Sequence, residues 1–265
     1  MFDFHQDKIP YFEIQKTVTS ENIIPFIEQY YGNVIGKHIL EIGCAEAGVL
    51  KAFIEHGNTG VGVELSSSRF DLAQSFLSDE IENNKAKIIN KNIYDIDHPK
   101  EEFGRLFDII VLKDVIEHIP DQEKFIPKLK EFLAEDGVIF FAYPPWWMPF
   151  GGHQQICRSK LLRTLPWFHL LPASLYKLML KSFGEHQATI DEMMDIKSTG
   201  INIERMYHIL KKNSFATKGE ILWFINPIYR FKFGLTSRKV FTLLSHLPFL
   251  RNFYTTAHYI CVGVG

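Results

Sequence analysis

Cysteine is scarce in this 265-residue chain, which contains three cysteines and no C-x-x-C pair. Cys44, Cys157 and Cys261 are scattered and odd in number, which argues against a disulfide framework and against a cysteine-based zinc site. We therefore expect reduced thiols and a cytoplasmic protein.

Long apolar runs are also missing from the sequence. The most apolar segments, residues 161–183 and 235–249, are interrupted by prolines, lysines or arginines, so neither is expected to span a bilayer. Asp3 and Asp7 lie near the start, where an export signal would be apolar. Peripheral contact with the inner face of the membrane is compatible with this pattern, and insertion of a spanning helix is not.

Acidic residues are rare in the second half of the chain. Residues 1–136 contain 14 Lys/Arg and 25 Asp/Glu, a net charge of −11, whereas residues 137–265 contain 15 and 6, a net charge of +9. The basic half is rich in aromatic residues, which suits an anionic or amphiphilic acceptor. An aromatic core under a solvated basic face is the equally weighted alternative. No sharp Lys/Arg cluster is present, so no nucleic-acid partner is expected.

One segment, residues 39–50 (ILEIGCAEAGVL), joins an apolar run to a glycine-containing turn and a helix-like pattern. It predicts a strand, a tight loop and a helix whose free N–H groups face a ligand, although a purely structural turn is the alternative. Ala45 replaces the second glycine of the pyrophosphate fingerprint, and Glu41 adds negative charge at the strand end. The loop therefore favours a cationic nucleoside such as S-adenosylmethionine.

Further strand patterns follow along the chain. Residues 59–64 end in Glu64, about 20 residues after Gly43, where a carboxylate conventionally binds ribose hydroxyls. More strands are predicted at residues 86–90, 107–112 and 137–143. Strands that alternate with helical segments indicate β-α-β units and a parallel sheet.

Five segments together resemble the class I S-adenosylmethionine-dependent methyltransferases. They are LEIGCAEAGVL, GVELSSSRFDLA, NIYDI, FDIIVLKDVIEHIPD and GVIFFAYP, within residues 36–145. The resemblance implies an α/β fold with a doubly wound, mostly parallel, seven-stranded Rossmann-like sheet. DVIEH resembles the branch that contains ubiquinone-pathway O-methyltransferases and other small-molecule methyltransferases.

The resemblance also divides the chain into regions. We expect an N-terminal cap (1–36), a cofactor-binding core (37–144), an insertion or lid for the acceptor (145–199), and a C-terminal helix with closing strands (200–265). A basic aromatic insertion, residues 226–254, interrupts the last region. The final strand, residues 257–263, is expected at the antiparallel edge of the sheet.

The resemblance further implies which residues contact S-adenosylmethionine, whose product is S-adenosylhomocysteine. The methionine moiety is assigned to Glu41, Gly43, Cys44, Ala45, Gly48, Lys113, Asp114 and Val115. The ribose position matches Glu64 and Leu65, and the adenine position matches Asp95 and Ile96.

Two histidines are candidate bases. Methyl transfer depends mainly on alignment, and a base is needed only when the acceptor is a hydroxyl or a protonated amine. His118 follows the fourth strand and His153 follows the fifth, and imidazole has an ordinary pKa of about 6.5. The alternatives are that His118 only packs beneath the cofactor or caps the local turn, and that His153 is simply solvated. With the two histidines as bases and the cofactor contacts given above, no residue is expected to bind a metal.

A divalent-metal site is a separate alternative. The D-x-x-E-H pattern of residues 114–118 resembles the E-x-x-E-H arrangement of metal-assisted methyltransferases that act on ubiquinone-pathway catechols or on the ribose hydroxyl of small RNAs. Asp114, Glu117, His118 and His153 would then be the ligands. Aspartate replaces glutamate at the first position and is one methylene shorter.

The sequence thus predicts methyl transfer, at oxygen, to a small-molecule, lipid-linked or glycan acceptor. A nicotinamide-dependent oxidoreductase is the competing enzyme class, disfavoured by Glu41 and Ala45. A catalytically silent methyltransferase-like binding protein is the other alternative, although Gly43, Glu64 and Asp95 are all retained.

Overall fold

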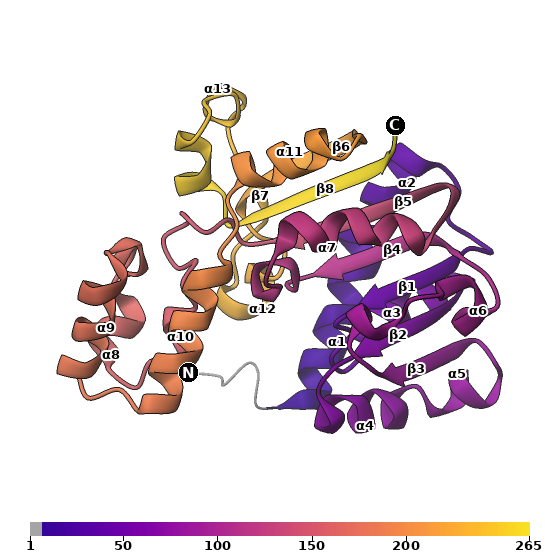
Figure 1. Cartoon of the computed structure of the whole chain (residues 1–265), viewed down its shortest axis with the longest axis horizontal. Coiled ribbons are helices and arrows are strands. Elements are labelled where there is room, and N and C mark those ends of the chain that lie inside the picture. Colours follow the sequence, from indigo (N-terminus) through magenta and orange to yellow (C-terminus); the bar gives the residue numbers. More distant parts are fainter. Residues whose placement is uncertain (1–6) are drawn as a thin grey trace.

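The computed structural model describes residues 7–265 (Figure 1). The first part of the expected N-terminal cap and Asp3 therefore lie outside the described residues. An eight-stranded sheet has the order β3-β2-β1-β4-β5-β8-β6-β7. Its strands are β1 (His38–Ile42), β2 (Thr59–Glu64), β3 (Ala86–Asn90), β4 (Phe107–Lys113), β5 (Leu133–Tyr143), β6 (Phe215–Ile225), β7 (Arg238–Lys239) and β8 (Ala257–Val264).

The predicted Rossmann-like fold is confirmed, but two details of the sheet differ from the expectation. The sheet has eight strands rather than seven because the two-residue β7 pairs with β6. Strand β8 lies between β5 and β6, antiparallel to both, rather than at the edge. Residues 257–263 are all buried, and a strand buried on both faces is more readily accommodated inside a sheet, where its backbone groups have partners on both sides.

Helices cover both faces of the sheet (Figure 1). They are α1 (Lys8–Val18), α2 (Ile24–Tyr31), α3 (Gly48–Glu55), α4 (Ser67–Phe76), α5 (Ser78–Glu82), α6 (Pro99–Phe103), α7 (Gln122–Lys128), α8 (Lys160–Thr164), α9 (Ala173–Ser182), α10 (Gln187–Thr199), α11 (Ile203–Lys212), α12 (Tyr229–Phe233) and α13 (Thr242–Ser245). One core cluster includes Phe53 and Phe140, and the cluster on the other face includes Phe141 and Ile209. The alternation of Phe140 and Phe141 follows from the two-residue period of a strand.

Helix α11 shows how a sequence pattern produces this packing. Ile203, Met206, Ile209 and Leu210 are buried on one side of the helix, as expected for apolar residues at helical spacing. The Asn202 side chain caps the helix by accepting a hydrogen bond from the Arg205 backbone N–H at 2.8 Å.

A third, smaller apolar cluster gathers residues from the segment after β5. It comprises Cys157, Leu162, Phe168, Tyr176, Leu180, Ile190 and Met193. Helices α8, α9 and α10 therefore form a lobe with its own core beside the sheet (Figure 1). Among the described residues, no helix combines the length and the apolarity needed to cross a membrane.

Candidate functional site

The loop between β1 and α3 is built on left-handed backbone conformations. Gly43, Ala45 and Ala47 have φ angles of 68°, 49° and 62°. The backbone N–H of Gly43 donates to the Val63 carbonyl oxygen at 2.8 Å, and that of Ala45 donates to the Glu64 carboxylate at 2.9 Å. The loop is thus held against the end of β2, and these bonds help offset the cost of left-handed alanines.

Close approach of the backbone explains the two glycines of this loop. A Cβ on Gly43 would lie 2.7 Å from Val115 Cγ2, and a Cβ on Gly48 would lie 2.6 Å from the Phe12 carbonyl oxygen. Gly43 therefore lets the loop after β4 approach, and Gly48 lets α1 dock on α3. Three residues of the predicted site, Gly43, Gly48 and Val115, therefore lie at the carboxyl ends of β1 and β4, and α1 packs beside Gly48.

Glu41 is buried beneath this loop. Its carboxyl group accepts a hydrogen bond from the backbone N–H of Leu50 in the first turn of α3, at 2.9 Å. Burial raises the pKa of Glu41 to about 8, against the lowering effects of the Leu50 N–H and of Lys113. A cation bound beside Glu41 would lower this pKa and favour the ionised carboxylate.

Glu64 organises the end of β2. In addition to Ala45, it accepts a hydrogen bond from the Ser66 backbone N–H at 2.8 Å. The Asn90 side-chain amide donates to the carbonyl oxygens of Glu64 and Leu65 at 2.8 and 3.0 Å. Leu65 is 69% exposed, so an apolar surface lies directly beside the carboxylate. Asn90 ends a predicted strand, but nothing in its local pattern identified this role.

Other predicted cofactor contacts differ in exposure. Cys44 is buried, and a Cβ on Gly62 would meet its sulfur at 2.7 Å, so its side chain packs on β2. Burial raises the pKa of the Cys44 thiol well above its ordinary value, so only its backbone suits a contact with a ligand. Asp95 is exposed and Ile96 is buried in the turn after β3.

Lys113 and Asp114 form an ion pair at the carboxyl end of β4. Their side-chain atoms Nζ and Oδ2 are 2.5 Å apart, with Lys113 6% and Asp114 43% exposed. Burial would raise the pKa of Asp114, but Lys113 and Lys232 outweigh burial and lower it. Asp114 has a φ angle of 55°, which turns the chain away from the strand.

Two elements that the sequence reasoning did not place here also reach this ion pair. Tyr11 of α1 interacts electrostatically with Lys113 and Asp114. Tyr229 and Lys232 of α12 interact with Asp114; burial and Asp114 raise the pKa of Tyr229 to about 12. Neither tyrosine lies in a recognisable motif, because these contacts arise only from tertiary packing.

Glu117, His118 and His153 form a third cluster. One potential ligand atom from each lies within 4.8 Å of the others, and the two imidazole ring centroids are 5.0 Å apart. Neither carboxylate oxygen of the buried Glu117 has a hydrogen-bond partner among the described residues. Burial, reinforced by Asp114, raises the Glu117 pKa well above its ordinary value.

Helix α10 fixes the backbone around this cluster. The Thr199 hydroxyl donates to the Glu117 carbonyl oxygen at 2.6 Å. The Gln122 side-chain amide donates to the carbonyl oxygens of Ile116 and Thr199 at 2.8 and 2.5 Å. The His118 residue is exposed at the surface, but the burial that its ring does have lowers its pKa below the ordinary value of imidazole.

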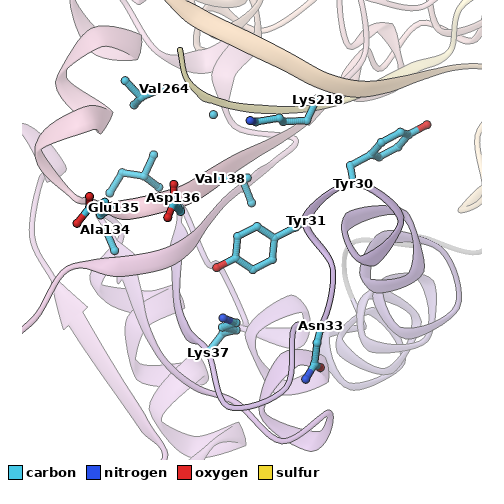
Figure 2. A pocket seen from close by; sticks show the side chains of 13 residues that line it. Tyr30, Tyr31, Asn33, Lys37, Ala134, Glu135, Asp136, Val138, Lys218 and Val264 are labelled. Carbon is cyan, nitrogen blue, oxygen red and sulfur yellow. The ribbon is translucent and has the colours of Figure 1, made fainter.

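A hollow of about 830 Å³ lies elsewhere (Figure 2). Its lining includes Tyr31, Lys37, Asp136 and Lys218, from segments before β1 and around β5 and β6. Lys37 and Asp136 lie near the amino ends of the parallel strands, whereas the residues described above lie at the carboxyl ends. Ligands of open α/β sheets bind at the carboxyl ends, so this hollow is distinct from the candidate site.

Comparisons of sequence match the chain to a known family and to curated relatives. A family model described as a methyltransferase domain matches residues 19–184. A ubiquinone biosynthesis O-methyltransferase from Coxiella burnetii is 30% identical over 119 residues, which cover 45% of this chain and 48% of that protein. One from Idiomarina loihiensis is 25% identical over 158 residues, covering 52% and 63%. The chain spans about half the length of the first of these curated relatives.

Solved structures resemble the chain over nearly its whole length. An S-adenosylmethionine-dependent methyltransferase from Clostridium acetobutylicum has a TM-score of 0.59 and 12% identity, covering 98% of this chain and 96% of that one. A magnesium protoporphyrin IX methyltransferase from Synechocystis, solved with S-adenosylhomocysteine, has a TM-score of 0.55 and 11% identity, covering 98% and 88%. At these identities, the likeness establishes the fold.

Proposed function

The chain belongs to the methyltransferase-domain family, as predicted from its sequence, and from this premise we propose that it transfers a methyl group from S-adenosylmethionine to a small-molecule acceptor. The observation that carries the proposal is the β1–α3 loop, with Glu41 buried beneath it and Glu64 bonded to Ala45. Two carboxyl groups at one crevice suit a cationic nucleoside and disfavour a pyrophosphate.

The residues around the crevice suggest how the cofactor would bind. Glu41 and the loop from Gly43 to Gly48 would hold the methionine moiety, and Glu64 with the exposed Leu65 would hold the ribose. When bound, S-adenosylmethionine supplies an electrophilic methyl group on a sulfonium. Asp95 and Ile96 remain the proposed adenine contacts, and Lys113, Asp114 and Val115 the contacts beneath the methionyl part.

We expect purified protein to bind S-adenosylmethionine in calorimetry with micromolar affinity and to ignore NADH. Glu64→Gln should weaken S-adenosylmethionine binding by roughly tenfold or more, because a charged acceptor of hydrogen bonds is lost. The exposed Glu82→Gln is the matched control and should bind normally. Preference for NADH, or equal loss in both variants, would contradict the proposal.

The acceptor is proposed to be an amphiphilic or anionic small molecule methylated at oxygen. A hydroxyl oxygen would attack the methyl carbon as the carbon–sulfur bond breaks, and its proton would pass to a base. His118 and His153 are the proposed bases, because both interact electrostatically with Asp114 at the carboxyl end of β4. A cytoplasmic location remains part of this proposal.

We also propose that the reaction uses a divalent cation, which the cluster of Glu117, His118 and His153 would bind. A buried carboxyl group whose two oxygens have no hydrogen-bond partner among residues 7–265 suits a cation. His118 and His153 would supply nitrogen ligands, a mixed set that suits Mn²⁺ or Zn²⁺ better than Mg²⁺. Such an ion would lower the pKa of an acceptor hydroxyl bound to it.

If such an ion takes part, EDTA should reduce turnover by about 100-fold, and Mn²⁺ or Zn²⁺ should restore it better than Mg²⁺. Glu117→Gln should lose the stimulation by metal while still binding S-adenosylmethionine in calorimetry. Turnover that is indifferent to the chelator would eliminate the metal and leave the histidines as the proposed bases.

A further inference from the structure

The segment between β6 and β8 carries an unusual concentration of exposed apolar side chains. Phe241 and Leu243 are 77% and 78% exposed, the highest values among the large hydrophobic residues of the described chain. Leu247, Phe249 and Leu250 are exposed in the same short stretch. All five belong to residues 238–254, a lobe that includes β7 and α13, and we call these five exposed side chains its apolar tip.

This lobe is anchored rather than loose. The Glu204 carboxylate of α11 accepts hydrogen bonds from the Phe249 backbone N–H at 2.8 Å and from the Arg251 guanidinium at 3.0 Å. The buried Asn252 donates to Glu204 at 2.5 Å and accepts from the Ile203 backbone N–H at 2.9 Å. The tip is therefore presented by a fixed support instead of collapsing onto the core.

The charge of the lobe points to the type of partner. Residues 221–265 contain no acid, and Arg238 and Lys239 at the base of the lobe are exposed and form no ion pair within residues 7–265. Arg251, in contrast, is paired with Glu204. Apolar side chains beside unpaired basic ones are the combination that binds the interface of an anionic bilayer.

The position of the lobe agrees with such a role. In Figure 1, α13 stands at one end of the molecule, beyond α11 and far from α4 and α5. A protein partner of standard size would need an interface of about 800 Å² on each side, which suits a broad face better than a short projecting tip. Insertion into a bilayer requires only a few apolar side chains and nearby positive charge.

We infer that the lobe of residues 238–254 docks this protein on membranes that contain anionic lipids, with Phe241 and Leu243 entering the interfacial layer. The docking itself is independent of the proposed function, but one consequence rests on it. Helix α12, which reaches Asp114, precedes the lobe by only a few residues, and Trp147 after β5 packs on Phe249 with ring centroids 6.0 Å apart. Docking would therefore place the acceptor side of the site near the bilayer, where an amphiphilic acceptor is found.

Co-sedimentation with vesicles tests the inference on the full chain. We expect binding to phosphatidylcholine vesicles that contain about one-third phosphatidylglycerol, and weaker binding to pure phosphatidylcholine. Phe241→Ser with Leu243→Ser should lower the partition coefficient about tenfold or more, and Arg238→Gln with Lys239→Gln should remove the preference for the anionic lipid. Leu178→Ser on α9, where the side chain is 59% exposed, is the matched control and should bind like the wild type.

Parallel measurements separate docking from misfolding and from self-association. Thermal unfolding should show that all variants are folded, and calorimetry with S-adenosylmethionine should be unchanged in the Phe241/Leu243 variant. Absence of wild-type binding to both vesicle types, or equal loss in the Leu178 control, overturns the inference. A change of the Phe241/Leu243 variant from oligomer to monomer in light scattering, without an effect on vesicles, would assign the tip to self-association instead. Failure to bind S-adenosylmethionine would count only against the proposed function.

Discussion

Gly43→Asp is expected to reduce the affinity for S-adenosylmethionine by more than about 100-fold, a loss of roughly 2.7 kcal/mol or more. The backbone at Gly43 has a φ angle of 68°, and any Cβ there would lie 2.7 Å from Val115 Cγ2. The aspartate would therefore push the loop away from the turn after β4 and occupy space in the crevice. Calorimetric titration measures the loss directly.

Gly104→Asp separates this effect from backbone strain. Gly104 also has a positive φ angle, 76°, but a Cβ there would meet nothing within 4 Å. It should therefore cost only the strain of a left-handed residue, about 1–2 kcal/mol of folding stability, and leave the affinity intact. If Gly43→Asp still bound the cofactor at wild-type affinity, the β1–α3 loop would not be the binding loop.

Glu41→Gln should stabilise the unliganded protein at neutral pH and have little effect in acid. The pKa of Glu41 is about 8 in the folded chain and 4.5 as an ordinary side chain. Because the folded pKa is raised, stability is fully present below pH 4.5 and is lost as the pH rises toward 8. At 1.36 kcal/mol per pKa unit, the loss for the wild type is about 3 kcal/mol by pH 7.

Urea unfolding at a series of pH values measures this dependence. The difference between Glu41→Gln and the wild type should grow between pH 4.5 and pH 8, whereas Glu82→Gln should follow the wild type. Glu117 also has a raised pKa, so the subtraction of the two curves, rather than the wild-type curve alone, isolates Glu41. A constant difference across this range would show that Glu41 does not titrate as its burial implies.

The local parts of the fold could be predicted because each follows from a short pattern. The alternation of apolar strands with helices indicated β1 to β5 in order, and the glycines located the loop at Gly43. The edge position expected for the last strand was wrong, because nothing within residues 257–263 specifies which strands lie beside them. Only pairing with β5 and β6 determines that placement.

Some residues of the candidate site could likewise be predicted from local patterns, and others could not. Glu41 and Glu64 could be identified because they end strands beside a glycine loop. Tyr11, Tyr229 and Lys232 could not, since α1 and α12 are more than 200 residues apart in the chain and reach Asp114 only through packing. The metal alternative drawn from the resemblance named Asp114, Glu117, His118 and His153 as ligands. Among the described residues, the geometry groups Glu117, His118 and His153 but leaves Asp114 outside the cluster.

The central position of β8 has a consequence for how the chain folds. Tyr143 of β5 and His258 of β8 are paired across 115 residues, and the buried Tyr143 hydroxyl is 2.9 Å from His258 Nδ1. The sheet can join its two halves only after this long loop closes, which makes its topology one of high contact order and slow assembly. The lobe of α8 to α10, with its own apolar cluster, lies inside that loop. Ordering of this lobe before β8 docks would shorten the effective loop and speed the closing step.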